Sequence, residues 1–362
     1  MNTLNAASKQ WASRPDDERF TSLSDLKASV LSRKQQSWTA TPITKDLRVI
    51  PAEDGLAVQV YDPTKGQSAN LYPTNWAFGQ LSQYAGAPAG YLRGLPAELA
   101  SINLQWGLEH SPIRDSGLVL AQSNGNNHLR AITSMSYGRI WDSQVVEAVE
   151  RVNEDDRWQI PAASYATTNP RRATTLYASD RDVFIFLVDP ANPIEVNGET
   201  LFRGFYVWNS EVGSSVFGLT TFLYRSVCDN RIIWGATNIK EINIRHTGGA
   251  PERFAYEGQK YLTRFANEST VKIVEGVKAA QITDIPVNGG KGDSVEDWLR
   301  ERGFTKAEAK ASVDTAVAEQ GSARTIWDIV NGVTAYARSI SHTDARVTLE
   351  QKAGALMKYA VN

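Results

Sequence analysis

The sequence has few of the residues on which many catalytic and structural sites depend. It contains 1 cysteine and 4 histidines in 362 residues. A single cysteine, Cys228, excludes an internal disulfide and a zinc site built from several cysteines. Neither the H-E-x-x-H metalloprotease motif nor the G-x-S-x-G hydrolase motif occurs in the chain. We therefore expect no catalytic set that can be named, no metal and no cofactor.

Long apolar runs and a strong net charge are also missing. No stretch approaches the roughly 18 apolar residues that a membrane span needs. The segment MNTLNAASKQWASRPDDERF lacks the apolar core of a signal peptide. The formal net charge is −2, so any attraction to nucleic acid would come from a local patch of cations. We expect a cytoplasmic protein that does not associate with membranes.

What the sequence does contain is a series of short strand patterns followed by helix patterns. Apolar runs flank turn signals at 123–127, at 179–181 and at Asn197-Gly198, and this arrangement predicts antiparallel hairpins. Asp142 is expected to cap a helix that runs to about Val152. Strands and helices do not alternate as a doubly wound parallel sheet requires.

After residue 252 the pattern becomes helical. Residues 253–282 read as one long amphipathic helix. Capping patterns predict the starts of four further helices, at Ser294-x-x-Asp297, Thr305-x-x-Glu308, Thr325-x-x-Asp328 and Ser341-x-x-Asp344. The predicted fold class is α+β, an antiparallel sheet with flanking helices, one long helix after the sheet, and a C-terminal helical subdomain. The predicted divisions are a body at 1–252, the long helix at 253–284 and the subdomain at 285–362.

Polar residues gather where two apolar strands of the 204–235 segment end. Asn209 and Glu211 follow the first strand, and Arg225 and Asn230 follow the second. If these strand ends lie together, the four residues form a candidate polar site, which would suit an enzyme of unknown reaction. The alternative is a buried ion pair between Glu211 and Arg225 with a structural role. Cys228 lies within this segment, but no histidine stands in a Cys–His signature with it.

Cations alternate with aromatic residues through the same region. On a sheet face, such residues can neutralise the backbone of a single strand and stack its bases. The alternative is a core strand whose long cations reach outward to solvent. The candidate nucleic-acid-binding residues are Arg130, Arg139, Arg203, Tyr206, Trp208, Arg231, Lys240 and Arg245.

Several sequence blocks carry a family resemblance. They are WASRPDDERFTSLSDL (11–26), LRGLPAELASINLQW (92–106), LRAITSMSYGRIWDSQV (129–145), and the segments 205–230 and 325–358. Through these blocks the chain resembles the phage- and plasmid-associated family called domain of unknown function 932. The resemblance implies a mobile-element origin and a bacterial host, but no reaction and no catalytic residue. The segment 284–321 departs from the pattern.

Three hypotheses follow. The first is a phage- or plasmid-encoded accessory protein of DNA metabolism that binds single-stranded nucleic acid without catalysis, of an annealing or protection type and possibly as a homo-oligomer. The sheet followed by a helix is also similar in architecture to single-strand annealing proteins. The second is the enzyme with the polar site described above. The third is a phage protein that binds a host factor, and its mark would be an exposed apolar patch outside the sheet face.

Overall fold

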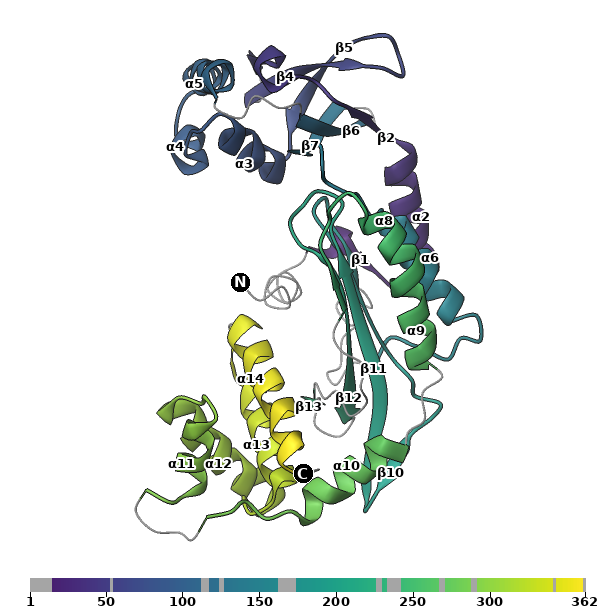
Figure 1. The fold of residues 1–362 in the computed structure, drawn as a ribbon, viewed down its shortest axis with the longest axis vertical. Coiled ribbons are helices and arrows are strands. Elements are labelled where there is room, and N and C mark those ends of the chain that lie inside the picture. Colours follow the sequence, from purple (N-terminus) through teal and green to yellow (C-terminus); the bar gives the residue numbers. More distant parts are fainter. Residues whose placement is uncertain are drawn as a thin grey trace.

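The computed structural model describes residues 15–52, 55–111, 117–123, 127–161, 174–225, 230–232, 242–266, 271–287, 292–340 and 343–360. Figure 1 shows an elongated molecule in which one sheet lies at the top, a second sheet lies in the middle, and the C-terminal helices lie at the bottom. The α+β fold class is confirmed by this arrangement.

The central sheet, sheet A, is antiparallel in every described pair. Its order is β1 (Arg19–Phe20), β8 (Leu176–Ala178), β9 (Val183–Val188), β11 (Glu199–Asn209), β12 (Phe217–Arg225) and β13 (Asn230–Ile232). β10 (Ile194–Val196) pairs with β11, and β14 (Ile242–Ile244) pairs with β12. The predicted hairpins at 179–181 and at Asn197-Gly198 are confirmed. Both residues of the latter turn have positive φ, 49° and 85°, as a two-residue hairpin of type I′ requires.

The upper sheet, sheet B, is mixed. Its order is β2 (Ser37–Ala40), β6 (Gly117–Ser123), β7 (Asn127–Ser134), β5 (Gln67–Pro73), β4 (Gly55–Asp62) and β3 (Arg48–Ala52). The β6–β7 hairpin confirms the turn predicted at 123–127, although residues 124–126 lie outside the described part. β5 and β7 form a parallel pair through Tyr72 and His128. Three helices pack on this sheet, α3 (Asn75–Tyr84), α4 (Ala89–Arg93) and α5 (Ala97–His110).

One face of sheet A is covered by helices. α2 (Leu23–Gln35), α6 (Asp142–Val152) and α9 (Gln259–Ala266) bury apolar side chains against it, and Figure 1 shows them on the same side of the sheet. α8 (Ala250–Arg253) and a short π-helix (Phe254–Gly258) lead into α9. Side chains alternate between faces along a strand. Phe205 and Val207 therefore face these helices, while Tyr206 and Trp208 face the other side.

The C-terminal helices form a separate apolar cluster that packs on one end of sheet A. They are α10 (Val271–Ile282), α11 (Val295–Glu301), α12 (Lys306–Gln320), α13 (Ile326–Arg338) and α14 (Thr343–Leu356). Ser294, Thr305 and Thr325 each cap a helix with the side chain, as predicted. The cap predicted at Ser341 lies outside the described residues.

The structure differs from the prediction of one long helix over 253–282. α9 and α10 point in different directions in Figure 1, and residues 267–270 between them lie outside the described part. The physical reason is that the two segments bury side chains in different cores. Phe254 and Leu262 pack against the helices on sheet A, whereas Ile273 and Val277 pack among the C-terminal helices. A single straight helix could not serve both cores.

Candidate functional site

Strand pairing separates the two halves of the polar site predicted from the sequence. β11 and β12 are antiparallel, so Arg225 pairs with Leu201 and Asn230, at the end of the sheet opposite to Asn209. Asn209 lies eight positions along β11 from Leu201, which corresponds to about 26 Å. The predicted clustering of these four residues is therefore wrong, because the carboxyl ends of antiparallel neighbours lie at opposite edges. The side chains of Arg225 and Asn230 lie outside the described part.

The Glu211 carboxylate contacts residues of β7, α2 and α6 instead of Arg225. Arg130 Nη2 from β7 lies 2.8 Å from Glu211 Oε2, and Arg33 Nε from α2 lies 3.8 Å from the same oxygen. The backbone N–H of Asp142 donates to Glu211 Oε1 at 2.9 Å. The predicted ion pair between Glu211 and Arg225 is thus wrong in its partner, although Glu211 does sit in a buried ion pair.

Asp142 and Asn209 complete this ionic cluster, which we define as Arg33, Arg130, Asp142, Asn209 and Glu211. Arg33 Nη2 lies 2.7 Å from Asp142 Oδ2, and Asn209 Nδ2 donates to Asp142 Oδ1 at 2.8 Å. Asn209 Nδ2 also donates to the carbonyl of Ile140 at 2.9 Å. Asp142 occupies the first position of α6 but points its carboxylate into the cluster, so it does not act as the predicted cap.

The two carboxyl groups have pKa values displaced in opposite directions. Burial, assisted by the nearby charge of Glu211, raises the pKa of Asp142 well above its ordinary value. Burial also acts to raise the pKa of Glu211, but Arg33, Arg130 and the Asp142 N–H outweigh it and hold the pKa below its ordinary value. Opposite shifts are common in acid–base sites. Both residues are only 1% exposed, however, so a substrate cannot reach them in this conformation.

A second layer of contacts surrounds the ionic cluster. Arg139 donates to the backbone carbonyl of Glu211, and Tyr137 Oη donates to the carbonyl of Ser210 at 2.8 Å. His246 Nδ1 lies 3.0 Å from the carbonyl of Gly138, and its ring stacks on Tyr137 with centroids 5.0 Å apart. Burial lowers the pKa of His246 to about 4. These contacts tie β7, the end of β11 and the segment after β14 together, so the whole assembly joins the two sheets.

Three of the six predicted phosphate-binding cations are buried. Arg130 and Arg139 belong to the assembly just described, and Arg203 is 4% exposed, with its Nη2 3.7 Å from Asp189 Oδ2. Their assignment to a phosphate-binding surface is wrong in this conformation, because each reaches a buried oxygen acceptor instead of solvent. Arg245 is exposed. Lys240 and the side chain of Arg231 lie outside the described residues.

The second face of sheet A carries a continuous set of aromatic rings, which we call the aromatic face. Tyr206 is half-buried and its ring centroid lies 5.7 Å from Phe184, 5.9 Å from Phe222 and 5.6 Å from Trp208. The interplanar angles of these three pairs are 28°, 30° and 35°, so the rings are roughly parallel. The aromatic face consists of Tyr177, Phe184, Phe186, Phe202, Tyr206, Trp208 and Phe222.

Two glycines allow these rings to lie across the sheet. A Cβ at Gly218 would overlap the Trp208 indole, and a Cβ at Gly204 would overlap the Phe222 ring. Glycine inside a strand often marks such a close approach. The sequence analysis selected Tyr206 and Trp208 but missed Phe184, Phe222 and both glycines. Glycines at positions 204 and 218 within aromatic strands were the signal that could have found them.

Polar side chains lie at both edges of the aromatic face. On β1, Arg19 pairs with Tyr177, and its guanidinium lies 5.7 Å from the centroid of that ring. On β14, Asn243 pairs with Gly218 and is exposed, and the exposed Arg245 follows directly after the strand. Cations therefore stand near opposite edges of the set of rings.

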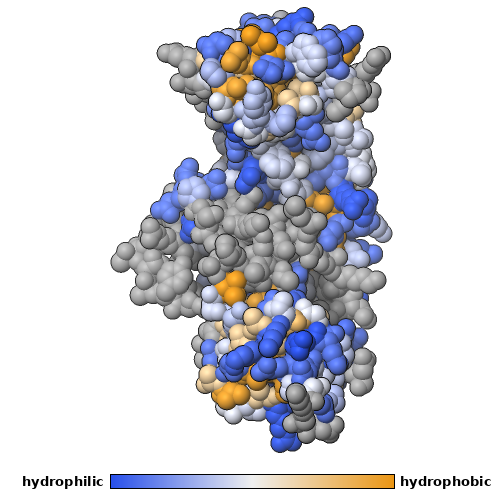
Figure 2. Space-filling model, turned by 90° about the vertical axis from the view of Figure 1, so that its left-hand side faces the viewer, coloured by the Kyte–Doolittle hydropathy of each residue, from blue (hydrophilic) through white to orange (hydrophobic). Residues whose placement is uncertain are grey.

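An exposed apolar stripe runs along α5. Leu99, Ile102 and Trp106 are 50%, 64% and 64% exposed, and their spacing of three and four residues places them on one side of the helix. Tyr91 of α4 is 61% exposed. Figure 2 shows hydrophobic residues gathered at the upper end of the molecule, where α4 and α5 lie. Such a patch, away from sheet A, is the mark expected for a protein that binds a partner.

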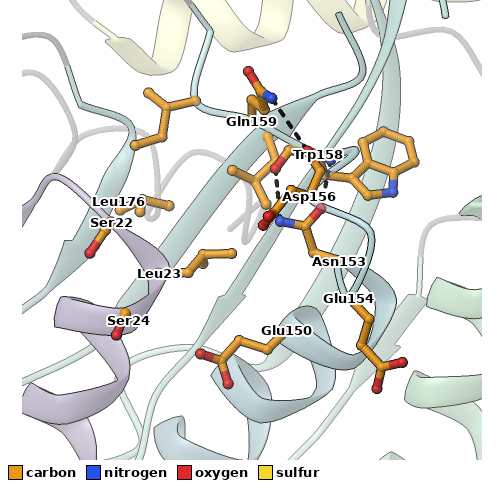
Figure 3. Close-up of a pocket in the computed structure, with 12 residues that line it drawn as sticks. Ser22, Leu23, Ser24, Glu150, Asn153, Glu154, Asp156, Trp158, Gln159 and Leu176 are labelled. Carbon is orange, nitrogen blue, oxygen red and sulfur yellow. Dashed lines mark hydrogen bonds between the residues drawn. The ribbon is translucent and has the colours of Figure 1, made fainter. Parts of the chain in front are cut away.

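A pocket of about 660 Å³ opens between the start of α2 and the end of α6. Figure 3 shows Leu23 and Leu176 within it and the carboxylates of Glu150 and Glu154 along one side. Asp156 also lines the pocket. Three carboxylates would repel phosphate, so this pocket does not suit a nucleic acid. Among the residues that the structure covers, no group of three or more His, Cys, Asp or Glu is placed to hold a metal ion.

None of the helices in the described ranges combines the length and the apolar character of a membrane span. No curated protein and no solved structure matches the chain. Residues 131–356 match the family described as Domain of unknown function (DUF932). The match includes the segment 284–321 that seemed to depart from the pattern, and it begins after the blocks at 11–26 and 92–106. Because the match covers more than half of the 362 residues, the chain belongs to the DUF932 family.

Proposed function

We propose that this protein binds single-stranded nucleic acid on the aromatic face of sheet A. In this proposal it is a phage- or plasmid-encoded accessory protein of DNA metabolism that anneals or protects single strands. The observation that supports the proposal is the set of roughly parallel rings around Tyr206, laid across the sheet over Gly204 and Gly218. Every base has a π-face, so stacking on such rings is tolerant of sequence and contributes about 1–3 kcal/mol per base.

Tyr206 is the ring that a base meets first. It is half-buried, whereas Trp208 and Phe222 are 1% and 3% exposed. It also contacts three other rings, so a base stacked on Tyr206 would be held by a surface that is already fixed in place. Preorganisation of this kind lowers the entropy lost on binding.

The charges near this face are few. Arg19 and Arg245 lie towards its edges, and the net charge of the chain is −2. Binding constants for a single strand fall as the salt concentration rises. In a plot of the logarithm of affinity against the logarithm of salt concentration, each neutralised phosphate contributes about −0.7 to the slope. Binding that depends mainly on stacking therefore weakens with salt, but less than binding to a strongly basic groove.

Fluorescence anisotropy with labelled oligonucleotides at two salt concentrations tests the proposal. Single-stranded DNA, single-stranded RNA and duplex DNA are compared, and both single strands are expected to bind more tightly than the duplex. Tyr206→Ala should weaken binding roughly tenfold, equal to about 1.4 kcal/mol, and Tyr206→Phe should retain it because the ring is kept. Circular dichroism confirms that both variants fold. The proposal is contradicted if single strands do not bind with micromolar affinity at low salt. It is also contradicted if a folded Tyr206→Ala variant binds them as tightly as the natural protein.

The α5 stripe favours a second candidate function, the binding of a host protein. Glu98 and Glu109 are exposed on the side of α5 next to Ile102. The complementary partner is a folded protein with an apolar groove bordered by basic side chains. A photo-reactive amino acid placed at Ile102 in cells should crosslink to such a protein, whereas one at the exposed Lys310 should not. A crosslink between two copies of the chain would indicate a homo-oligomer instead, and no crosslink specific to position 102 would remove this candidate.

A further inference from the structure

The pocket between the start of α2 and the end of α6 is separate from the aromatic face. Leu176 and Leu187 in its lining belong to the core on the helix-covered face of sheet A. Its volume of about 660 Å³ falls within the range of small-molecule sites, roughly 300–1,000 Å³. Ser24, Glu154 and Asp156 in the lining are exposed, so the pocket is open to solvent. A ligand can therefore enter it without any rearrangement of the core.

Part of the pocket wall is apolar. Leu176 of β8 and Leu187 of β9 are buried core side chains that reach the pocket, and Leu23 and Ile160 add to this apolar wall. Contact with such a wall favours a ligand that carries hydrocarbon groups, because their transfer out of water lowers the free energy. A small hydrated ion would gain nothing from it.

The charged groups in the lining all carry the same sign. Glu150 Oε2 lies 2.7 Å from Lys27 Nζ, but Lys27 does not line the pocket. Glu154 and Asp156 form no ion pair with any residue that the structure describes. α6 ends at Val152, so the negative end of its dipole lies on the same side as these carboxylates. The potential on this side of the pocket therefore favours a cation.

The opposite side of the pocket, at the start of α2, does not cancel this preference. The positive end of α2 faces its own Asp25, which lies in the first turn of the helix. The Ser22 hydroxyl accepts a hydrogen bond from the Asp25 N–H at 3.0 Å and so satisfies one free donor of the helix. Figure 3 shows the start of α2 facing Glu150 across the pocket.

The turn that carries Asp156 is held by three hydrogen bonds. Asn153 Nδ2 donates to the carbonyl of Trp158 at 2.9 Å, and Asn153 Oδ1 accepts from the Trp158 N–H at 2.6 Å. The Asp156 N–H donates to the carbonyl of Asn153 at 3.0 Å. The φ of Asp156 is 53°, in the left-handed region that aspartate and asparagine adopt more readily than most residues. The backbone under this carboxylate is thus in place before a ligand binds, which lowers the entropy lost on binding.

We propose that the pocket binds a linear aliphatic polyamine, with ammonium groups paired to Glu154 and Asp156 and the methylene chain against the apolar wall. A metal ion fits the same features less well. In the described part of the chain no three ligating side chains converge on one point, and a metal would leave the apolar wall unused. This site lies apart from the aromatic face, so the inference does not depend on the binding of nucleic acid.

Isothermal titration calorimetry with spermidine, without any nucleic acid, tests the inference. The probe 1,8-diaminooctane is compared with 1,8-octanediol, which has the same chain length but no charge. Both amines should bind, and the diol should bind at least about fivefold more weakly, because it forms no ion pair. Magnesium chloride at the same charge concentration should give no comparable heat, since Mg²⁺ offers no hydrocarbon chain.

Two variants locate the binding site. Glu154→Gln with Asp156→Asn removes both charges but keeps the side-chain shapes, and asparagine suits the left-handed backbone at position 156. This double variant should weaken spermidine binding about fivefold or more. The matched control is Glu301→Gln with Asp314→Asn, which removes the same charge from exposed positions outside the pocket. Ser24→Trp adds bulk to the exposed wall without changing the charge, and it should weaken binding as well. Circular dichroism checks that each variant folds.

Three results would overturn the inference. The first is an absence of heat with spermidine at low salt. The second is equal binding of the diol and the diamine. The third is an equal loss of affinity in the pocket double variant and in its control, which would mean that the amines only collect around the acidic surface of the protein. Retained binding in the control, together with weaker binding in both pocket variants, would support the polyamine site.

Discussion

Arg130 and Glu211 face each other at the junction of the two sheets, with Nη2 and Oε2 2.8 Å apart and both side chains at most 2% exposed. Arg130 belongs to sheet B, and Glu211 follows the last strand residue of β11 in sheet A. The two sheets are therefore coupled through charges that are withdrawn from water. Removing one partner of a buried pair leaves an uncompensated charge.

Arg130→Met should lower the free energy of unfolding by about 3–5 kcal/mol, because Arg33 is then the nearest cation to the carboxylate of Glu211, and it lies farther away at 3.8 Å. Chemical denaturation monitored by circular dichroism measures this loss. The matched control is Arg48→Met, which breaks a 3.2 Å pair with Glu109 in which both side chains are well exposed. That change should cost no more than about 1 kcal/mol. Equal effects of the two variants would contradict the interpretation.

His246 should make stability depend on pH. Its pKa is about 4 in the folded protein, below the value of 6.5 for an unperturbed histidine, so the unfolded chain takes up the proton first. The stabilising contribution is complete above pH 6.5 and is lost as the pH falls from 6.5 towards 4. The loss is about 3 kcal/mol, from about 1.4 kcal/mol per pKa unit. Stability measured by urea denaturation at several pH values should show this slope.

His246→Asn should remove most of that slope, since asparagine does not titrate and its amide can still donate to the carbonyl of Gly138. His110→Asn is the control, because His110 lies on the exposed side of α5. The slope should survive in this second variant. A slope that persists unchanged in His246→Asn would assign the pH dependence to other groups.

Gly218→Ala should displace the Trp208 indole, because the added Cβ would overlap it. Overpacking of this kind costs about 1–3 kcal/mol, and the near-ultraviolet circular dichroism of the tryptophan should change with it. Gly248→Ala is the control, since a Cβ there has no atom within 4 Å and its φ is not positive. Binding of single strands should weaken in Gly218→Ala only, which ties the ring arrangement to the proposed function.

Thr325→Ala should destabilise the C-terminal helices. The Thr325 hydroxyl accepts from the backbone N–H of Asp328, and the Asp328 carboxylate accepts from the N–H of Thr325 in return. Loss of such a cap costs about 1 kcal/mol. Hydrogen exchange along α13 and thermal unfolding would both report it. Thr325→Ser should behave like the natural sequence because serine caps equally well.

The predictions that succeeded concern neighbours in the chain. The Thr325 cap joins residues three apart, and the Asn197-Gly198 turn joins adjacent strands. In such cases the residue types and their spacing are enough to define the geometry. The α+β class followed from the order of these local elements, because hairpins preceded a series of capped helices.

The ionic cluster could not be derived in the same way. Arg130 and Glu211 are 81 positions apart, and Arg33 and Asp142 are 109 apart. The sequence analysis assigned Arg130 to a nucleic-acid-binding surface, but its guanidinium lies against Glu211, which follows β11 of sheet A. One feature of the sequence did indicate a buried ion pair, since Arg130 stands between Leu129 and Ala131 in a strand pattern, where a buried charge requires an opposite charge.

The aromatic face could be predicted in part from the sequence. Alternation along β11 correctly puts Tyr206 and Trp208 on one side, and only the register with β9 and β12 adds Phe184 and Phe222. The error over Arg225 arose from the same source. Strand ends that look alike in sequence lie far apart when neighbouring strands run in opposite directions.

The pairing of β1 with β8 has a consequence for synthesis on the ribosome. Phe20 finds its partner in Leu176, so a ribosome adding about 5–20 residues per second needs roughly 8 to 30 s to make the chain between them. All strands of sheet B are complete by Ser134, within that interval. Sheet B can therefore fold before the ribosome has made β8, the strand with which β1 pairs. Until then, the earliest strand of the central sheet is an open edge in the nascent chain, exposed to chaperones and to other chains emerging nearby.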